Sequence, residues 1–150
     1  MKINSILENK GSDCVRISPA SSLLEASKVM CEHKIGSLMV FEGENMKSIV
    51  TERDIMIAVS KNDDLAKITV ESVMPKNLIT CKPDNSLEEI MALMVKNDSG
   101  HRIRHLPVVE NEKFLGIISI IDVIEQLLNE SQFENQILKN YIKKWPDEAA

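Results

Sequence analysis

Aromatic residues are scarce in this sequence, at 3% of 150 residues, so a core has to be built mainly from aliphatic side chains and the eight methionines. Long hydrophobic runs are also missing, and no apolar stretch reaches the roughly 20 residues that a membrane-spanning helix needs. The first residues, MKINSILENKG, contain no apolar segment of the kind found in a secretory signal peptide. We therefore expect a soluble protein without a membrane partner.

Cysteine is rare as well. Cys14, Cys31 and Cys81 are far apart, odd in number and not arranged as CxxC or with histidines. This pattern predicts neither a disulfide framework nor a metal site, and we interpret all three as small buried hydrophobic residues. Thiols of this kind are typical of a reducing compartment, so we predict a cytoplasmic location.

The sequence also has no surplus of positive charge, since its net charge is −5. Without it the chain lacks the general attraction to phosphates that nucleic-acid-binding proteins use, and we expect no nucleic-acid partner. The basic run HRIRH (101–105) is too short to change that expectation. Any site for an anion must therefore be local.

What the sequence does contain is an internal repeat. One constant shift along the chain aligns PASSLLEASKVM (19–30) with PDNSLEEIMALM (83–94). A slightly larger shift aligns LMVFEGENMKSIVTERD (38–54) with LPVVENEKFLGIISIID (106–122). The difference between the two shifts indicates an insertion in the second copy, near 97–102. We infer two copies of one structural unit.

Both copies predict the same order of elements. A short β-rich stretch (14–18 or 78–82) precedes a helix, two β-rich runs around a polar turn follow, and a last helix begins at TERD (51–54) or SIID (119–122). Each β-α-β-β-α unit would have one apolar sheet face, and two units packed together could share a core. The predicted fold class is therefore α/β (α+β).

The first helix of each copy has a clear start. Ser22 with Glu25, and Ser86 with Glu89, form capping boxes in which the hydroxyl accepts a hydrogen bond from a backbone N–H of the first turn. Apolar residues then recur at helical spacing, which predicts the buried face of each helix. These residues are Leu23, Ala26 and Met30 in the first copy, and Leu87, Ile90 and Met94 in the second.

The whole ordered unit, present twice, resembles the tandem pair of cystathionine-β-synthase-type (CBS) domains, or Bateman module, in its stand-alone bacterial or mitochondrial type. The likeness covers roughly residues 3–128 and is strongest in VMPKNLITCKPDNSLEEIMALM, in RIRHLPVVENEKFLGIISIIDVI and in the two boxes TERD and SIID. The resemblance implies two units related by pseudo-two-fold symmetry. It also implies adenosine ligands bound in clefts between the units, and a regulatory role without catalysis.

We expect three segments on this basis. Residues 1–62 form the first CBS unit with an N-terminal helix at 3–11, residues 68–128 form the second unit, and residues 129–150 form a C-terminal helical extension. The polar stretch SKNDDLAK (60–67) joins the units.

A hydroxyl-x-x-Asp box is far more often a simple helix cap than a ligand site. Here it recurs after a strand and before a helix in both copies, at a helix N-terminus that suits a phosphate. A carboxylate can also accept two hydrogen bonds from a ribose diol. We therefore favour a nucleotide-binding role in which Asp54 and Asp122 hold ribose, while Thr51 and Ser119 contact phosphate.

The resemblance assigns further residues to the two clefts. Adenine would lie against Leu78, Ile79 and Thr80 in the Asp54 cleft, and against Cys14, Val15 and Ile17 in the Asp122 cleft. Arg104 and His105 would contact phosphate in the second copy, and arginine offers bidentate hydrogen bonds to that group. At the corresponding place the first copy has the uncharged Gly36 and Ser37, with Arg53 as its available cation.

We predict an adenine-nucleotide sensor that modulates a client protein, with AMP as the first ligand to test and NAD(H), ADP or ATP as alternatives. A ligand-free scaffold remains a second hypothesis. An enzyme is disfavoured because no nucleophile with a base and no metal site is visible, although the family also supplies accessory modules to enzymes such as inosine-monophosphate dehydrogenase.

An apolar stripe in the predicted helix 123–145 needs burial, either on the same module or on a partner chain. Since Bateman modules commonly pair, we favour a homodimer with this tail and the helix at 3–11 at its interface. The stripe consists of Phe133, Ile137, Leu138, Tyr141, Ile142 and Trp145.

Overall fold

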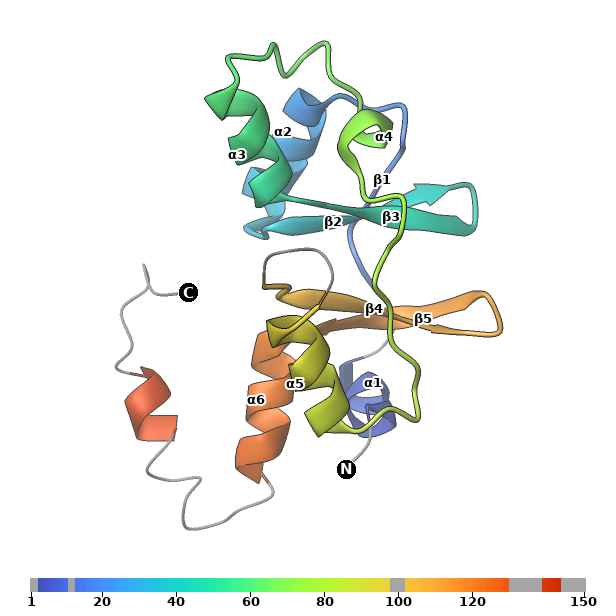
Figure 1. Ribbon diagram of the computed structural model, residues 1–150, viewed down its shortest axis with the longest axis vertical. Helices are drawn as coiled ribbons and strands as arrows, with labels where there is room; N and C mark the ends of the chain where they lie inside the picture. The colour runs from blue at the N-terminus through green and yellow to red at the C-terminus, as the bar shows by residue number, and fades with distance from the viewer. Residues whose placement is uncertain (1–2, 11–12, 98–101, 130–138, 144–150) are drawn as a thin grey trace. The chain divides into compact units, whose positions relative to one another are not determined.

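The computed structural model describes residues 3–10, 13–97, 102–129 and 139–143 (Figure 1). The chain divides into two compact units. The N-terminal unit spans Asp13–Ile79, and the C-terminal unit combines helix α1 (Asn4–Lys10) with the chain from Thr80 onward. Each unit mixes a small β-sheet with helices, which confirms the predicted α/β class.

The N-terminal unit follows the predicted order of elements and adds one short helix. Its three-stranded sheet has the order β1-β2-β3, with β1 parallel to β2 and β2 antiparallel to β3. Its elements are β1 (Arg16–Ile17), α2 (Leu23–His33), β2 (Ser37–Glu42), β3 (Asn45–Thr51), α3 (Glu52–Ser60) and the unpredicted α4 (Val70–Val73).

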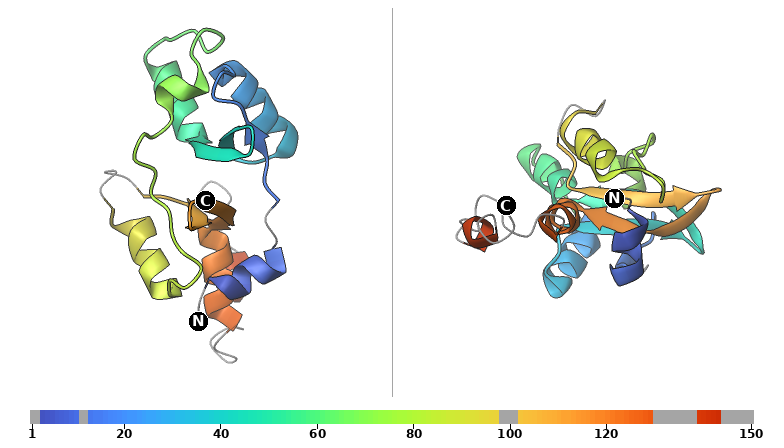
Figure 2. Two further views of the ribbon diagram at one scale, coloured as in Figure 1. Left: turned by 90° about the vertical axis from the view of Figure 1, so that its right-hand side faces the viewer. Right: turned by 90° about the horizontal axis from the view of Figure 1, so that it is seen from below.

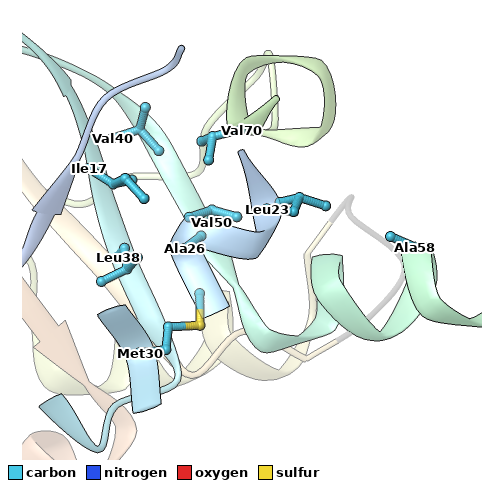
Figure 3. Packing of buried hydrophobic residues seen from close by; sticks show 9 residues of the cluster. All are labelled: Ile17, Leu23, Ala26, Met30, Leu38, Val40, Val50, Ala58 and Val70. Atoms are coloured by element: carbon cyan, nitrogen blue, oxygen red, sulfur yellow. The ribbon is translucent and has the colours of Figure 1, made fainter. Parts of the chain in front are cut away.

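The core of this unit lies between its sheet and its helices (Figure 3). Side chains that point to one face of the strands meet the buried stripe of α2, and Val70 of α4 closes the cluster. All of these residues are aliphatic or methionine, so this cluster contains no aromatic ring. The cluster consists of Ile17, Leu23, Ala26, Met30, Leu38, Val40, Val50, Ala58 and Val70.

The C-terminal unit repeats the pattern with a smaller sheet. Strand β4 (His105–Glu110) pairs antiparallel with β5 (Lys113–Ser119), and the helices are α5 (Leu87–Val95) and α6 (Ile120–Asn129). The strand predicted over 78–82 is reduced to a single parallel bridge between Cys81 and Val108. The Cys81 N–H donates to Pro107 O at 3.0 Å, and Cys81 O accepts from the Val109 N–H at 2.9 Å.

The predicted helix starts are confirmed. Ser22 Oγ accepts from the Glu25 N–H at 3.1 Å, and Ser86 Oγ accepts from the Glu89 N–H at the same distance. All six residues of the predicted helical stripes are buried: Leu23, Ala26 and Met30 on α2, and Leu87, Ile90 and Met94 on α5. The cap therefore fixes where each helix begins, and the apolar spacing fixes which face it buries.

Strand register confirms that the two copies are equivalent. Ser37 pairs with Thr51 in the N-terminal unit, and His105 pairs with Ser119 in the C-terminal unit, as the alignment of the two copies predicted. Both hairpins also carry a register irregularity at the same place, between Val40 and Phe41 in one and between Val108 and Val109 in the other. The repeat is thus preserved down to the local twist of the strands.

Helix α1 is not grouped with the first unit, where the sequence analysis placed it. Ile6 of α1 and Ile3, which directly precedes the helix, are both buried, and α1 packs against β5 and α6 of the C-terminal unit (Figure 2). The Ile3 N–H donates to Asn85 O at 3.3 Å. Two isoleucines at a short helix need an apolar surface, and the C-terminal unit provides it.

The predicted tail is described only in part. Residues 139–143 are helical, with Tyr141 and Ile142 exposed. The other stripe residues lie outside the described residues: Phe133, Ile137, Leu138 and Trp145. Most of the predicted insertion, residues 98–101, lies outside them too.

A buried serine distinguishes the two hairpins. Ser48 on β3 is fully buried, and its Oγ donates to Pro75 O at 2.8 Å. The equivalent position on β5 is Gly116, which has no side chain to donate. In the N-terminal unit the segment after α4 is therefore fastened to the sheet by a side-chain hydrogen bond, and burial of the hydroxyl costs little because it is paired.

The three cysteines occupy three different environments: Cys81 is buried, Cys14 is half-buried and Cys31 is exposed. The expectation that all three are buried is thus wrong for Cys31, which lies on the outer face of α2. Burial raises the pKa of the Cys81 thiol from 9.0 to about 12. Since the thiolate is the reactive form of cysteine, Cys81 is protected twice, by burial and by protonation.

We expect a thiol reagent at pH 8 to label Cys31 rapidly and to label Cys81 only in unfolded protein. In unfolded protein Cys81 ionises near pH 9, but in folded protein only near pH 12. The contribution of this group to stability is therefore complete below pH 9 and is lost as the pH rises toward 12. Urea denaturation at pH values from 8 to 11 measures this loss. The free energy of unfolding should fall less steeply with pH in Cys81→Ala than in the unchanged protein. Equal falls in both proteins would contradict the assignment.

Candidate functional site

The SIID box lies where β5 ends and α6 begins. The Ser119 N–H donates to Asp122 Oδ2 at 2.8 Å, and the Asp122 N–H donates to Ser119 Oγ at 3.1 Å. This is a complete capping box, and both side chains are half-buried. The cap orients the Asp122 carboxylate at the N-terminus of the helix.

The TERD box, at the junction of β3 and α3, shares the amide-to-carboxylate hydrogen bond of the SIID box. The Thr51 N–H donates to Asp54 Oδ2 at 2.8 Å, and the Thr51 hydroxyl lies 3.5 Å from the same oxygen. Thr51 and Asp54 are half-buried, like their counterparts in the other unit. Each unit therefore presents one hydroxyl and one carboxylate where its last helix begins.

The residue just before each hairpin contributes the next part of the site. The Glu52 N–H donates to Gly36 O at 2.9 Å, and the Ile120 N–H donates to Arg104 O at 2.8 Å. Gly36 and Arg104 therefore stand at equivalent positions, each beside the start of a helix. In each unit the structure brings the predicted residues together: Gly36, Ser37, Thr51, Arg53 and Asp54 in one, and Arg104, His105, Ser119 and Asp122 in the other.

The predicted adenine-lining residues belong to the segments that open each repeat. Cys14 and Val15 are half-buried, whereas Ile17 is only 8% exposed and packs into the core of the N-terminal unit. The side chain of Ile17 points to the helices because side chains alternate along a strand, so only its backbone could meet a ligand. Leu78, Ile79 and Thr80 are half-buried and lie outside the strands.

The two helix starts differ in charge. The first turn of α3 carries the carboxylates Glu52 and Asp54, whereas the first turn of α6 carries Asp122 alone. Glu52 also fills the space beside Gly36: a side chain at position 36 would place its Cβ 2.9 Å from Glu52 Oε2. The second unit has Ile120 and Arg104 at these two positions.

Sequence reasoning assigned Arg53 to this place and missed Glu52. An alignment of the two copies offers the signal, since a carboxylate at 52 aligns with an isoleucine at 120 and a glycine at 36 aligns with an arginine at 104. Only the structure shows that the two substitutions meet in space.

Two further properties of the described residues bear on other functions. Within the described ranges, no helix is both long enough and apolar enough to cross a membrane. Among the same residues, no group of three or more His, Cys, Asp or Glu side chains is placed to hold a metal ion.

Comparison with protein families gives a match to the CBS domain over residues 10–61 and 70–129. These segments include both boxes and most of the chain. The chain belongs to the CBS-domain family. The match occurs twice, so this is a tandem CBS pair, as the internal repeat indicated.

Relatives of this CBS pair support the assignment. The CBS domain-containing protein YhcV of Bacillus subtilis is 29% identical over 130 residues, which cover 86% of this chain and 90% of the relative. The crystal structure of the CBS-domain containing protein ATU1752 from Agrobacterium tumefaciens has a TM-score of 0.75 at 33% identity, covering 85% of this chain and 99% of that one. Both relatives are described as CBS-domain proteins.

A further CBS structure carries ligands. The CBS domain pair of protein MJ0100 was solved in complex with 5′-methylthioadenosine and S-adenosyl-L-methionine. It has a TM-score of 0.71 at 25% identity, and the alignment covers 87% of this chain and 98% of that chain.

Proposed function

We propose that this CBS pair is a non-catalytic regulatory module that binds adenosine-containing ligands, with AMP at the C-terminal unit, and so modulates a client protein. In this proposal Asp122 holds the ribose, Ser119, Arg104 and His105 contact the phosphate, and Arg104 carries the positive charge. The corresponding ribose ligand of the N-terminal unit is Asp54.

One observation carries the proposal: both units present a half-buried hydroxyl and carboxylate in matched geometry at the start of a helix, with the amide-to-carboxylate hydrogen bond at 2.8 Å in each. The caps at Ser22 and Ser86 also recur in both copies, but the boxes at 51–54 and 119–122 differ from them because each begins on the last residue of a hairpin strand. The MJ0100 pair, which binds two adenosine compounds, supports the ligand class.

The cap and the ligand role are chemically compatible. An ionised carboxylate has two oxygens and about four acceptor positions, and the backbone N–H uses one of them. A ribose diol offers two adjacent donors, so the same aspartate can cap its helix and hold the sugar. The positive end of the helix dipole and the first-turn N–H groups then favour a phosphate beside the hydroxyl.

Titration calorimetry of the full chain with AMP, ADP, ATP and NADH tests the proposal. We expect AMP to bind, and to raise the free energy of unfolding by about 2.7 kcal/mol when present at a hundred times its dissociation constant. A protein that shows no heat and no thermal shift with any adenine compound would instead be the scaffold of our second hypothesis. Turnover of AMP, ATP or NADH by pure protein would contradict a non-catalytic role.

The proposal includes a homodimer. Exposed apolar side chains support it within the described residues, since Met56 and Val59 on α3 and Tyr141 in the tail are each more than half exposed. We expect sedimentation velocity to give the mass of two chains. A Met56→Glu, Val59→Glu variant should shift the population toward one chain. A monomer at all concentrations would refute this part.

A further inference from the structure

The two helix starts differ in charge at one matched position, and this difference has a consequence for ligand choice. Gly36 and Arg104 are equivalent because their carbonyls accept from the first amide of α3 and α6, at 2.9 and 2.8 Å. A ligand group that meets the Arg104 side chain in one unit would therefore meet the space beside Gly36 in the other.

That space is occupied by a carboxylate. A Cβ at position 36 would lie 2.9 Å from Glu52 Oε2 and 3.2 Å from Glu52 Oε1, so the whole carboxylate group faces the glycine. Glycine is the residue that allows this approach, since any larger residue would have to displace Glu52. The cation of the C-terminal site is thus replaced by an anion in the N-terminal site.

The charges on the surrounding first turns strengthen the contrast. Glu52 and Asp54 give the α3 start two negative charges against one cation, Arg53, and the side chains of Glu52 and Arg53 are both exposed. The α6 start has Asp122 as its acidic residue and the neighbouring segment contributes Arg104 and His105. A phosphate would be repelled by Glu52 at the first site and attracted by Arg104 at the second, and because both side chains are exposed the effect should weaken as salt is added.

From this we propose that the N-terminal site selects adenosine compounds without a 5′-phosphate, carrying a neutral or positively charged 5′ group, and that Glu52 is the residue that excludes phosphate. The C-terminal site selects the 5′-phosphate. This inference rests on the proposed function, because it assumes that both aspartates hold ribose. The module would then report two different adenosine compounds at once.

The test uses two probes that differ at the 5′ carbon, AMP and 5′-methylthioadenosine. In the Asp122→Asn protein, where the C-terminal site is weakened and the N-terminal site is the unchanged one, we expect 5′-methylthioadenosine to bind the N-terminal site at least tenfold more tightly than AMP does. Adding Glu52→Gln should raise the affinity for AMP at least tenfold and change that for 5′-methylthioadenosine less than threefold. Glutamine keeps the shape of the side chain, and a melting curve checks the fold.

A matched control is Glu88→Gln, which removes an exposed first-turn carboxylate from α5 and changes the net charge by the same amount. It should leave both affinities unchanged. The reverse exchange, Ile120→Glu in the Asp54→Asn protein, should weaken AMP binding to the C-terminal site at least tenfold.

The outcomes distinguish a failure of charge selection by Glu52 from a failure of nucleotide binding itself. If AMP binds the Asp122→Asn protein as tightly as 5′-methylthioadenosine and Glu52→Gln changes neither affinity, charge selection is wrong while nucleotide binding stands. If neither probe binds the unchanged protein, the proposed function itself fails and the charge selection fails with it.

Discussion

Asp122→Asn is expected to weaken AMP binding by a factor of roughly 10 to 150, because hydrogen bonds to a charged group contribute about 1.5–3 kcal/mol. Asparagine has nearly the same shape as aspartate, and its carbonyl oxygen can still accept from the Ser119 N–H, which lies 2.8 Å from Asp122 Oδ2. It cannot accept from both hydroxyls of a ribose diol in the way a carboxylate does. Binding should therefore fall while the fold is kept, and calorimetry with AMP measures the fall.

The choice of asparagine matters because alanine would remove the cap as well. Loss of the charge at the helix start should cost only about 0.3–1 kcal/mol of stability. Asp84→Asn is the matched control, since Asp84 is exposed and belongs to the same unit. If neither Asp122→Asn nor Asp54→Asn changes the affinity of the protein for any adenosine compound, the two boxes serve only as helix caps.

Ile3→Ala is expected to destabilise the C-terminal unit by about 2–5 kcal/mol, the range measured when a fully buried aliphatic side chain is truncated. Ile3 is 0% exposed, and its N–H donates to Asn85 O at 3.3 Å. Urea denaturation followed by circular dichroism gives the change in the free energy of unfolding. This prediction distinguishes the observed packing of α1 from the grouping with residues 1–62 that the sequence suggested.

Hydrogen exchange can locate the effect. Amides of β5 and α6, against which α1 packs, should exchange faster in Ile3→Ala, since local stability there depends on the buried isoleucine. Glu8→Ala, which changes an exposed residue on the same helix, should alter the free energy of unfolding by no more than about 0.5 kcal/mol. Faster exchange in α2 and β2 instead would show that α1 supports the other unit.

The elements and their caps could be predicted because their signals are local. Ser22 and Ser86 accept from amides within the first turn of their own helices, and the buried stripes repeat within a single helix. The alignment of one copy with the other then placed the hairpins, since it relates Thr51 to Ser119. These are short-range patterns that the chain carries twice.

Long-range pairings were the part that could not be predicted. The stretch 78–82 is β-rich, yet only Cys81 pairs with β4. Pairing between strands depends on their register, which the sequence of the stretch does not determine. Nor does the sequence of residues 3–11 say which apolar surface will bury Ile3. In the candidate site, the aspartates and hydroxyls could be predicted from the repeat, but the approach of Glu52 to Gly36 depends on backbone geometry.

The grouping of α1 with the chain beyond Thr80 also orders events during synthesis. Because translation proceeds from the N-terminus, α1 is made before the Asp13–Ile79 unit, whereas β5 and α6 are made after it. The whole Asp13–Ile79 unit can therefore fold before α1 has its packing partners, while Ile3 and Ile6 are still exposed to water. Completion of the C-terminal unit thus requires a segment made before the Asp13–Ile79 unit to pack against segments made after it.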